Sequence, residues 1–309
     1  MRKVWIVLIG LVLTGVGLAG EDAELQKLLE NQLKGFHGVA GVYVRNLKTG
    51  QTAALNADTL FPTASMIKVP ILLKIFDCIE QGSLHYNEDL TWYADTVHYD
   101  PDDGILCQFQ EGKKISLGKV ISLMITYSDN HASLWLQHLA GGGVAINQWL
   151  DEHGFKDTRV NSRTEGRLPI REIYGWGQTT PREMAELVAL IYRRQAISPA
   201  ASEEMVRVLG NIFWDGESLS RIPPDIKTCS KQGAVDQSRS EVVLVNAPSG
   251  PYVFCLITKN QADTSWKYDN EGYVLLRKVS GLLWNYYEPG RPYTPATDAR
   301  YFKSDVVPD

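Results

Sequence analysis

Segments that favour β-strands lie near both ends of the chain and enclose a long helical block. Two strands joined by a turn are expected within residues 39–56, and three more short strands within residues 225–260. Residues 117–195 show mostly helical spacing of apolar side chains. The economical solution is an α+β fold, in which both ends of the chain build one antiparallel sheet flanked by helices, with an all-helical part inserted between them. A cleft between two such parts is a natural place for a site.

A buried helix is expected from Ser65 to about Gln81, with Gly82 as its stop. Its first turn carries the hydroxyl of Ser65 and the amine of Lys68 in an otherwise apolar stretch. Residues three apart share one helix face, so this amine can reach the hydroxyl and accept its proton, and apolar burial favours its neutral form. The alternative is an ordinary helix start with Ser65 as a cap, because S-x-x-K alone occurs often by chance.

Two further motifs follow in the chain. Ser128, Asp129 and Asn130 lie between two helical runs, and residues 231–233 (Lys-Gln-Gly) lie on an expected strand. Gly233 there allows close approach of another backbone. In this order, S-x-x-K, S-D-N and K-x-G resemble the three signatures of class A β-lactamases and penicillin-binding proteins. The resemblance extends from about residue 38 to residue 285. It implies the β-lactamase/transpeptidase-like fold, with a five-stranded antiparallel sheet flanked by helices plus an all-α subdomain.

The resemblance implies a role for each matching residue. Ser65 would be the acylated nucleophile and Lys68 its proton acceptor or relay. Ser128 would pass a proton to the leaving nitrogen, and Asn130 would hold the substrate amide. Lys231 would supply positive potential for the substrate carboxylate.

The resemblance also implies an oxyanion hole and a base for deacylation. The backbone N–H groups of Ser65 and Ala234, beside Gly233, would form the oxyanion hole. Arg163-Thr164-Glu165 resembles the R-x-E of the family's omega loop, in which Glu165 would activate the deacylating water. Whether Lys68 or Glu165 is the acylation base stays open.

The chain departs from the family at the carboxylate-binding motif. Gln232 replaces the usual small hydroxyl residue, and the strand "EVVLV" lacks the Arg that the family often has there. Arg221 and Arg239 are candidate substitutes for binding the carboxylate, and Arg221 is better placed. A solvated surface arginine is the alternative for Arg221.

The omega loop departs more strongly. Pro169 stands where an Asn helps to hold the deacylating water, and it has neither a side-chain amide nor an N–H. Gly177 and Gln178 stand where the Asp of a loop-pinning Arg–Asp pair is expected. Glu172 is a candidate substitute for that Asp or for the base, and an exposed loop carboxylate is the alternative. The residues expected for acylation are therefore all present, whereas the residues expected for deacylation are altered.

Composition and the N-terminus limit the setting. The net charge of -5 argues against a nucleic-acid binder, which usually needs a basic face. Residues 1–20 carry two cations, an apolar run and a small-x-small pattern, which predict a signal peptide and a periplasmic or secreted protein. An uncleaved anchor is the alternative, although the run is shorter than the ~20 residues needed to span a bilayer. No stable membrane insertion is expected after cleavage.

The cysteines and histidines do not indicate a metal site. Cys78, Cys107, Cys229 and Cys255 lack C-x-x-C spacing, and buried thiols or one disulfide are expected. No cofactor and no metal are expected, and the expected partner is a small-molecule substrate bound by a monomer.

The expected organisation is a signal peptide, one catalytic domain and a tail. The catalytic domain spans 21–288, with an α/β part from about 21–62 and 206–288, an all-α part from about 63–205, and a tail at 289–309. The expected function is that of an exported serine hydrolase that opens β-lactam rings through a Ser65 acyl-enzyme and hydrolysis. The alternatives are a DD-peptidase or penicillin-binding hydrolase with poor β-lactam turnover, and a catalytically silent binding relative.

Overall fold

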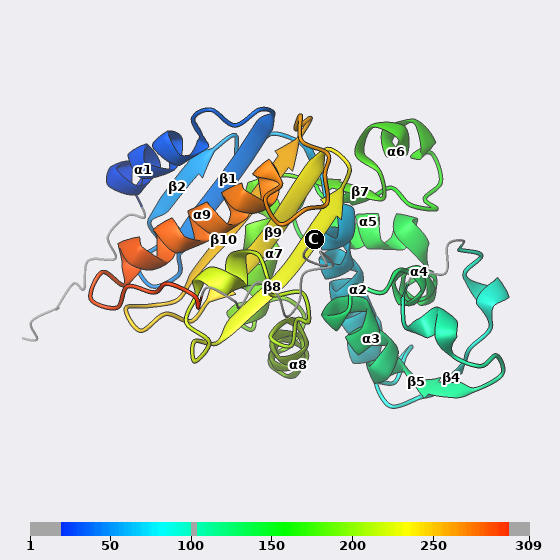
Figure 1. Ribbon diagram of the computed structural model, residues 1–309. Helices are drawn as coiled ribbons and strands as arrows, with labels where there is room; N and C mark the ends of the chain where they lie inside the picture. The colour runs from blue at the N-terminus through cyan, green and yellow to red at the C-terminus, as the bar shows by residue number, and fades with distance from the viewer. Residues whose placement is uncertain (1–19, 100–103, 297–309) are drawn as a thin grey trace, which may run out of the picture.

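The computed structural model describes residues 20–99 and 104–296. A five-stranded antiparallel sheet stands beside a helical part, and the strands come from both ends of the chain (Figure 1). The strand order is β2-β1-β10-β9-β8. The strands are β1 (Val39–Asn46), β2 (Thr52–Leu55), β8 (Thr228–Val235), β9 (Ser238–Val245) and β10 (Tyr252–Lys259). The α+β fold with this sheet confirms the fold class predicted from the sequence.

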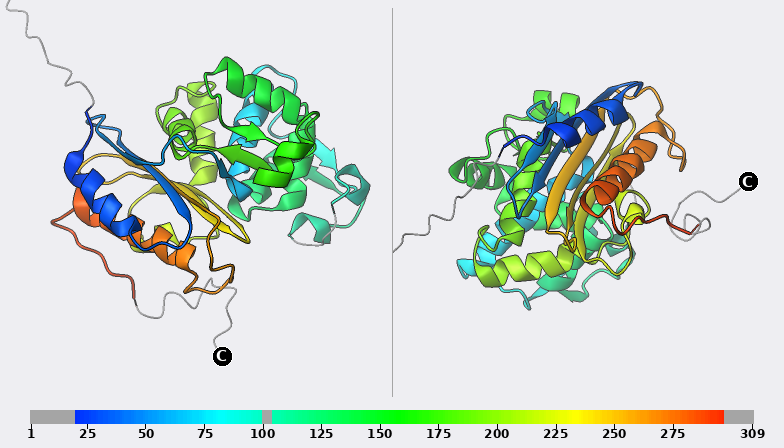
Figure 2. Two further views of the ribbon diagram at one scale, coloured as in Figure 1. Left: turned by 90° about the horizontal axis from the view of Figure 1, so that it is seen from above. Right: turned by 90° about the vertical axis from the view of Figure 1, so that its left-hand side faces the viewer.

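Helices cover both faces of the sheet. Figure 2 shows α1 (Ala23–Leu33) and α9 (Glu271–Tyr287) side by side on one face. On the other face, α7 (Pro181–Tyr192) packs against β1, β9 and β10, and α8 (Pro199–Leu209) packs against β8. Alternation along each strand gives each face its own core. On β9, for example, Val243 and Val245 belong to the cluster under α9, whereas Val242 and Leu244 belong to the cluster shared with the helical part.

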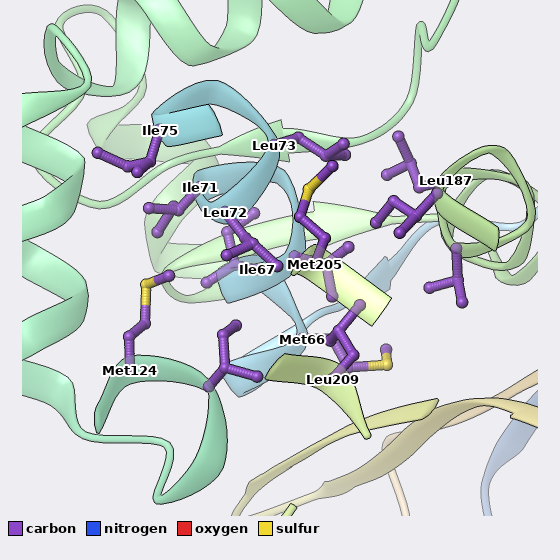
Figure 3. Close-up of a cluster of buried hydrophobic side chains, with 14 of the residues drawn as sticks. Met66, Ile67, Ile71, Leu72, Leu73, Ile75, Met124, Leu187, Met205 and Leu209 are labelled. Atoms are coloured by element: carbon purple, nitrogen blue, oxygen red, sulfur yellow. The ribbon is translucent and has the colours of Figure 1, made fainter. Parts of the chain in front are cut away.

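The helical part is built around α2 (Lys68–Glu80), which is apolar on nearly all sides. Figure 3 shows Ile71, Leu72 and Ile75 of α2 within a cluster that includes Leu187 of α7 and Met205 of α8. A helix that is apolar all round is stable only when it is buried. The neighbours of α2 are α3 (Leu117–Thr126), α4 (Asn130–Leu139), α5 (Gly142–Glu152), α7 and α8.

Short elements complete the described chain. The small strands are β3 (Phe61–Pro62), β4 (Asp89–Thr91), β5 (Lys114–Ser116), β6 (Arg159–Val160) and β7 (Gly177–Thr179). The remaining helices are α6 (Leu168–Tyr174) and the 3₁₀ turns η1 (Ala64–Ile67), η2 (Ala94–Thr96), η3 (Leu106–Gln108) and η4 (Ser218–Arg221). Residues 157–180, which lack clear periodicity in the sequence, thus contain α6 between β6 and β7. The helix expected to open at Ser65 begins instead as η1 and continues as α2 from Lys68.

The predicted signal peptide lies outside the described residues, except for Gly20. Within 20–99 and 104–296, no helix is long and apolar enough to cross a membrane. The four cysteines are free thiols, three of them buried, so the structure has buried thiols where the sequence left a disulfide open.

Truncation of Leu283 tests the packing of α9 on the sheet. Leu283 is fully buried, so Leu283→Ala is expected to lower the free energy of unfolding by about 2–5 kcal/mol through lost contacts and a residual cavity. Leu168, which is 63% exposed, offers the matched control. Leu168→Ala should change the free energy of unfolding by less than about 0.5 kcal/mol. Urea unfolding followed by circular dichroism measures both, and equal effects would contradict the packing described here.

Candidate active site

Ser65 lies on a strained turn between β3 and α2. Thr63 is anchored through its N–H, which donates to the carbonyl of Gly177 at 2.9 Å. The next residue, Ala64, has a φ of 44°, a left-handed conformation that costs a non-glycine residue on the order of 1–3 kcal/mol. The turn η1 then presents Ser65 at the amino end of α2, beside the edge strand β8. Such strain clusters at functional sites, where the surrounding structure over-determines the backbone.

The Lys68 amine joins two of the three sequence motifs. Its side chain is fully buried, and Nζ lies 3.0 Å from Ser65 Oγ. The same nitrogen lies 3.0 Å from Ser128 Oγ and 2.8 Å from Asn130 Oδ1. A buried amine must find polar partners, because an unsatisfied one would cost several kcal/mol. The expected nucleophile and the expected proton carrier are thus both among the partners of Lys68.

Asp129 fixes the turn that carries the second motif. Ser128 has a φ of 61°, and the chain enters α4 directly after it. The Asp129 carboxylate caps α4 by accepting from the N–H of Ala132 at 2.8 Å. It also accepts from the N–H groups of Ile105 and Leu106 at 2.7 and 2.8 Å. The middle residue of S-D-N is thus a structural clamp, a role that sequence reasoning did not assign.

Lys231 brings in the third motif from β8. It is fully buried, and its Nζ donates to Ser128 Oγ at 3.0 Å and to the carbonyl of Gln232 at 3.0 Å. Burial lowers the pKa of the Lys231 amine to about 7, and the negative charge of Glu241 opposes part of that shift. Ser128 Oγ is therefore flanked by two lysines, a suitable position for relaying a proton.

Gly233 lets β8 lie directly against the backbone of Ser65. A Cβ at this position would lie 2.6 Å from the carbonyl oxygen of Thr63 and 2.8 Å from the backbone nitrogen of Ser65. No larger residue fits without moving the backbone. The close approach predicted for this glycine is present.

A cavity of about 490 Å³ opens in front of Ser65. Its lining residues are Pro62, Ala64, Ser65, Tyr99, Asn130, Ile173, Tyr174, Gly175, Trp176, Ala234, Val235, Gln237, Ser238, Lys259 and Asn260. The volume is in the range of small-molecule sites. None of these described residues is acidic, and Lys259 carries a charge that sequence reasoning did not notice. Ser65 and Ala234, whose N–H groups are expected to form the oxyanion hole, both line the cavity.

The structure does not bring Glu165 to the cavity. Glu165 is exposed and is not among the lining residues, so the geometry expected of a deacylating base is not found. The arginine that holds this loop is four residues later in the chain than Arg163, the arginine of the sequence motif. Arg167 donates to Gln178 Oε1 at 2.8 Å and to Asn161 Oδ1 at 2.6 Å. Gln178 thus accepts a hydrogen bond where the family has an ion pair, and the R-x-E at Arg163 does not coincide with the pin.

Glu172 does not take the place of the missing base, and Pro169 lies on the same short helix. Both are exposed residues of α6, and neither lines the cavity. The following segment, Ile173 to Trp176, forms the wall of the cavity instead. Two aromatic residues of this segment, Tyr174 and Trp176, therefore line the cavity, whereas Glu165 and Glu172 do not.

Arg221 and Arg239 also lie away from the cavity. Arg221 is on η4 and lies against α9. A Cβ added to Gly281 of α9 would be 3.8 Å from the Cβ of Arg221. Arg239 is buried between the rings of Trp266 and Tyr273, its guanidinium carbon 4.6 Å from each ring centre. Its guanidinium donates to the carbonyl of Ser265 at 2.7 Å. The prediction that Arg221 reaches the substrate carboxylate is therefore not supported by the geometry.

Comparisons with known proteins identify the family of this chain. The beta-lactamase enzyme family matches residues 22–287. Beta-lactamase VEB-1 of Pseudomonas aeruginosa is 20% identical over 296 residues, 93% of this chain and 98% of that protein. Beta-lactamase BRO-1 of Moraxella catarrhalis is 25% identical over 238 residues, 74% of each chain. The solved structure of PBP-A is 25% identical with a TM-score of 0.76, covering 87% of this chain and 97% of that one.

The fold and the site define a hydrolase of the serine β-lactamase and penicillin-binding type. The match over most of the chain shows that this protein belongs to the beta-lactamase enzyme family.

The buried position of Lys231 leads to a pH-dependent prediction. The Lys231 pKa of about 7 means that this amine is a cation below that pH and neutral above it. The second-order rate of acylation by a β-lactam with a free carboxylate should therefore fall as pH rises above about 7, by up to about tenfold per pH unit. The profile of Lys231→Arg should stay flat there, because arginine keeps its charge. A flat profile of the unmodified protein would contradict the prediction.

Gly233 allows a steric test. Gly233→Val should push β8 away from Ser65 and lower the acylation rate about 100-fold or more, because an error of 1 Å in positioning can cost that much. Gly216 has open space around its missing side chain, so Gly216→Val is the matched control and should acylate normally. Fluorescent penicillin labelling measures both, with circular dichroism to check folding. Normal labelling of Gly233→Val would show that the contact with Ser65 is unimportant.

Proposed function

We propose that this protein opens β-lactam rings by acylation of Ser65 and then hydrolyses the acyl-enzyme, with hydrolysis as the slower step. The observation that carries the proposal is the position of Lys68 Nζ, within 3.0 Å of both Ser65 Oγ and Ser128 Oγ. Nucleophile, base and proton carrier are thus in contact before substrate arrives.

Acylation uses these three side chains and two backbone N–H groups. Lys68 in its neutral form takes the proton of Ser65 Oγ, which attacks the lactam carbonyl carbon. The carbonyl oxygen becomes an anion that the N–H groups of Ser65 and Ala234 stabilise. When the ring C–N bond breaks, Ser128 gives its proton to the nitrogen and recovers one from a neighbouring lysine. The product is an ester of Ser65 with the opened lactam.

Hydrolysis of that ester is the step with less support. It requires a water activated by a base, and a positioned general base typically contributes about 10²–10⁴-fold to such a rate. The described lining residues include no carboxylate, and Glu165 is exposed. Each ~1.4 kcal/mol added to the barrier slows deacylation about tenfold. A long-lived acyl-enzyme is the expected consequence.

The same observation favours a second candidate function. An enzyme that acylates well and deacylates slowly behaves as a penicillin-binding peptidase acting on peptidoglycan peptides. PBP-A, a structural neighbour, has also been solved as a variant in an acyl-enzyme complex with penicillin G. The two functions share Ser65 chemistry and differ in the natural acyl donor.

We also infer export to the periplasm or the outside of the cell. The support is the sequence of residues 1–20, with Arg2 and Lys3 before an apolar run. An exported protein whose N-terminal sequence still begins at Met1 would contradict cleavage.

Intact-protein mass spectrometry after mixing with benzylpenicillin tests the proposed function. We expect the mass to rise by one penicillin, the adduct to persist for minutes or longer, and the adduct to be lost in Ser65→Ala. Slow release of penicilloate in parallel would support β-lactam hydrolysis, and release only of D-alanine from peptides would support the peptidase. No adduct with benzylpenicillin would overturn the proposal.

Glu165→Gln tests the base predicted from the sequence. Because Glu165 is exposed, this variant should change the adduct lifetime less than about twofold, well below the 10²–10⁴-fold effect of a general base. An adduct living ten or more times longer would give Glu165 the role of the deacylating base after all.

A further inference from the structure

We propose that Lys259 forms an anion-binding subsite for the acyl arm of the substrate, so that the preferred acyl donors carry a carboxylate at the far end of that arm. The proposal rests on the proposed function, because it concerns the acyl group that Ser65 receives. Lys259 is the last residue of β10 and lines the cavity in front of Ser65.

The sheet register separates Lys259 from Lys231. Lys231 pairs with Val242 on β9, and Val242 pairs with Cys255 on β10. Lys259 is therefore two strands away and four residues further along β10. With strands about 4.8 Å apart and residues about 3.3 Å apart, the two Cα atoms are roughly 16 Å from each other. The Lys231 amine is held at Ser128 Oγ and the Lys259 amine at the carbonyl of Leu60, so the two amines form separate sites.

Ser65 lies between these two cations along the sheet. Gly233, which touches the Ser65 backbone, pairs with Ser240, and Ser240 pairs with Ile257. This row of residues is two positions beyond Lys231 and two positions before Lys259. A substrate whose carbonyl is at Ser65 and whose leaving-side carboxylate points to Lys231 must extend its acyl arm the other way. That direction leads toward Lys259.

Local contacts hold the Lys259 ammonium without neutralising it. Nζ donates to the carbonyl of Leu60 at 2.7 Å and lies 4.8 Å from the centre of the Phe61 ring. Neither partner is an anion, and no carboxylate of residues 20–99 or 104–296 forms an ion pair with Lys259. An ammonium has three N–H donors, so Leu60 uses one of them. Desolvation lowers the Lys259 pKa, and an arriving carboxylate would relieve that cost.

The surroundings favour an anionic group over a cationic or apolar one. Gln237, Ser238 and Asn260 line the same end of the sheet and add neutral polar groups. Across the cavity, Tyr174 and Trp176 give an apolar wall suited to a methylene chain. The substrate class is therefore an N-acyl group with a short apolar arm that ends in a carboxylate, on a β-lactam or on a D-alanyl peptide.

A purely structural role is the competing explanation for Lys259. Its hydrogen bond to Leu60 supports the segment just before β3 and Ser65. Loss of that support would slow acylation by every substrate equally. Loss of an anion subsite would slow only substrates with the terminal carboxylate, so the ratio between matched substrates separates the two.

The test compares adipoyl-6-aminopenicillanate with its side-chain methyl ester, which differ only in the terminal charge. We expect the unmodified protein to be acylated about tenfold faster by the acid, and Lys259→Met to bring the ratio close to one. Lys259→Arg should keep most of the preference. Lys227 is an exposed lysine outside the cavity, so Lys227→Met is the matched control and should keep the full ratio.

Two outcomes would overturn the subsite. One is a ratio near one in the unmodified protein, and the other is an unchanged ratio in Lys259→Met. Benzylpenicillin, which has no terminal carboxylate, should acylate all four proteins, so its failure would contradict the proposed function and not the subsite.

A binding measurement keeps the subsite testable if no β-lactam reacts. Calorimetry with N-adipoyl-D-alanine, the product-like ligand, on Ser65→Ala should give about tenfold weaker binding when Lys259→Met is added. Equal binding would overturn the proposal. Release of D-alanine from adipoyl-D-Ala-D-Ala, compared with its adipoyl methyl ester, shows whether the preference extends to peptides; a preference with both donors or with either one supports the subsite.

Discussion

The burial of Lys68 is the interaction on which the rest of the site depends. Its side chain is fully buried, and its amine is held by oxygen atoms of Ser65, Ser128 and Asn130. Lys231 approaches the same turn from β8. Three segments that are far apart in the sequence are therefore tied together by two buried amines. Neither amine would be stable in this interior unless all three segments were in place.

The sheet separates this polar centre from a second buried network. On the face of β9 next to α9, the Glu241 carboxylate accepts hydrogen bonds from Ser230 Oγ at 2.7 Å and from the Ser218 N–H at 2.9 Å. Burial raises the pKa of Glu241, and the negative charge of this carboxylate in turn raises the pKa of Lys231. The electrostatics of the cavity are thus set partly by a residue on the opposite face of the sheet, next to α9. A charged residue of the scaffold, Glu241, thus alters the pKa of a residue of the site, Lys231.

Local patterns predicted much of the fold, and the resemblance to class A β-lactamases predicted which residues form the central part of the site. Strand alternation and helical spacing indicated the sheet and α2, and the three-residue spacing of Ser65 and Lys68 holds across the junction from η1 to α2. The close approach of another backbone at Gly233 was predicted because glycine has no side chain to prevent it.

The remaining features depend on tertiary contacts that no local pattern encodes. The pairing of Arg167 with Gln178 sets the register of the loop, and from sequence alone Arg163 is an equally good partner. For the same reason the exposed position of Glu165 could not be foreseen. In the sequence, Lys259 is an ordinary lysine at the end of a strand. Only the order of the strands in the sheet shows that it lines the cavity. Arg239 carries no signal that would place it between two aromatic rings.

The split origin of the sheet has a consequence for biosynthesis. The centre of the sheet joins β1, made early, to β10, made late, and Lys231 arrives only with β8. A growing chain cannot assemble the site before nearly all of it has been synthesised. A chain that ends before residue 228 therefore contains Ser65 and Lys68 but lacks both Lys231 and the edge strand that lies beside Ser65.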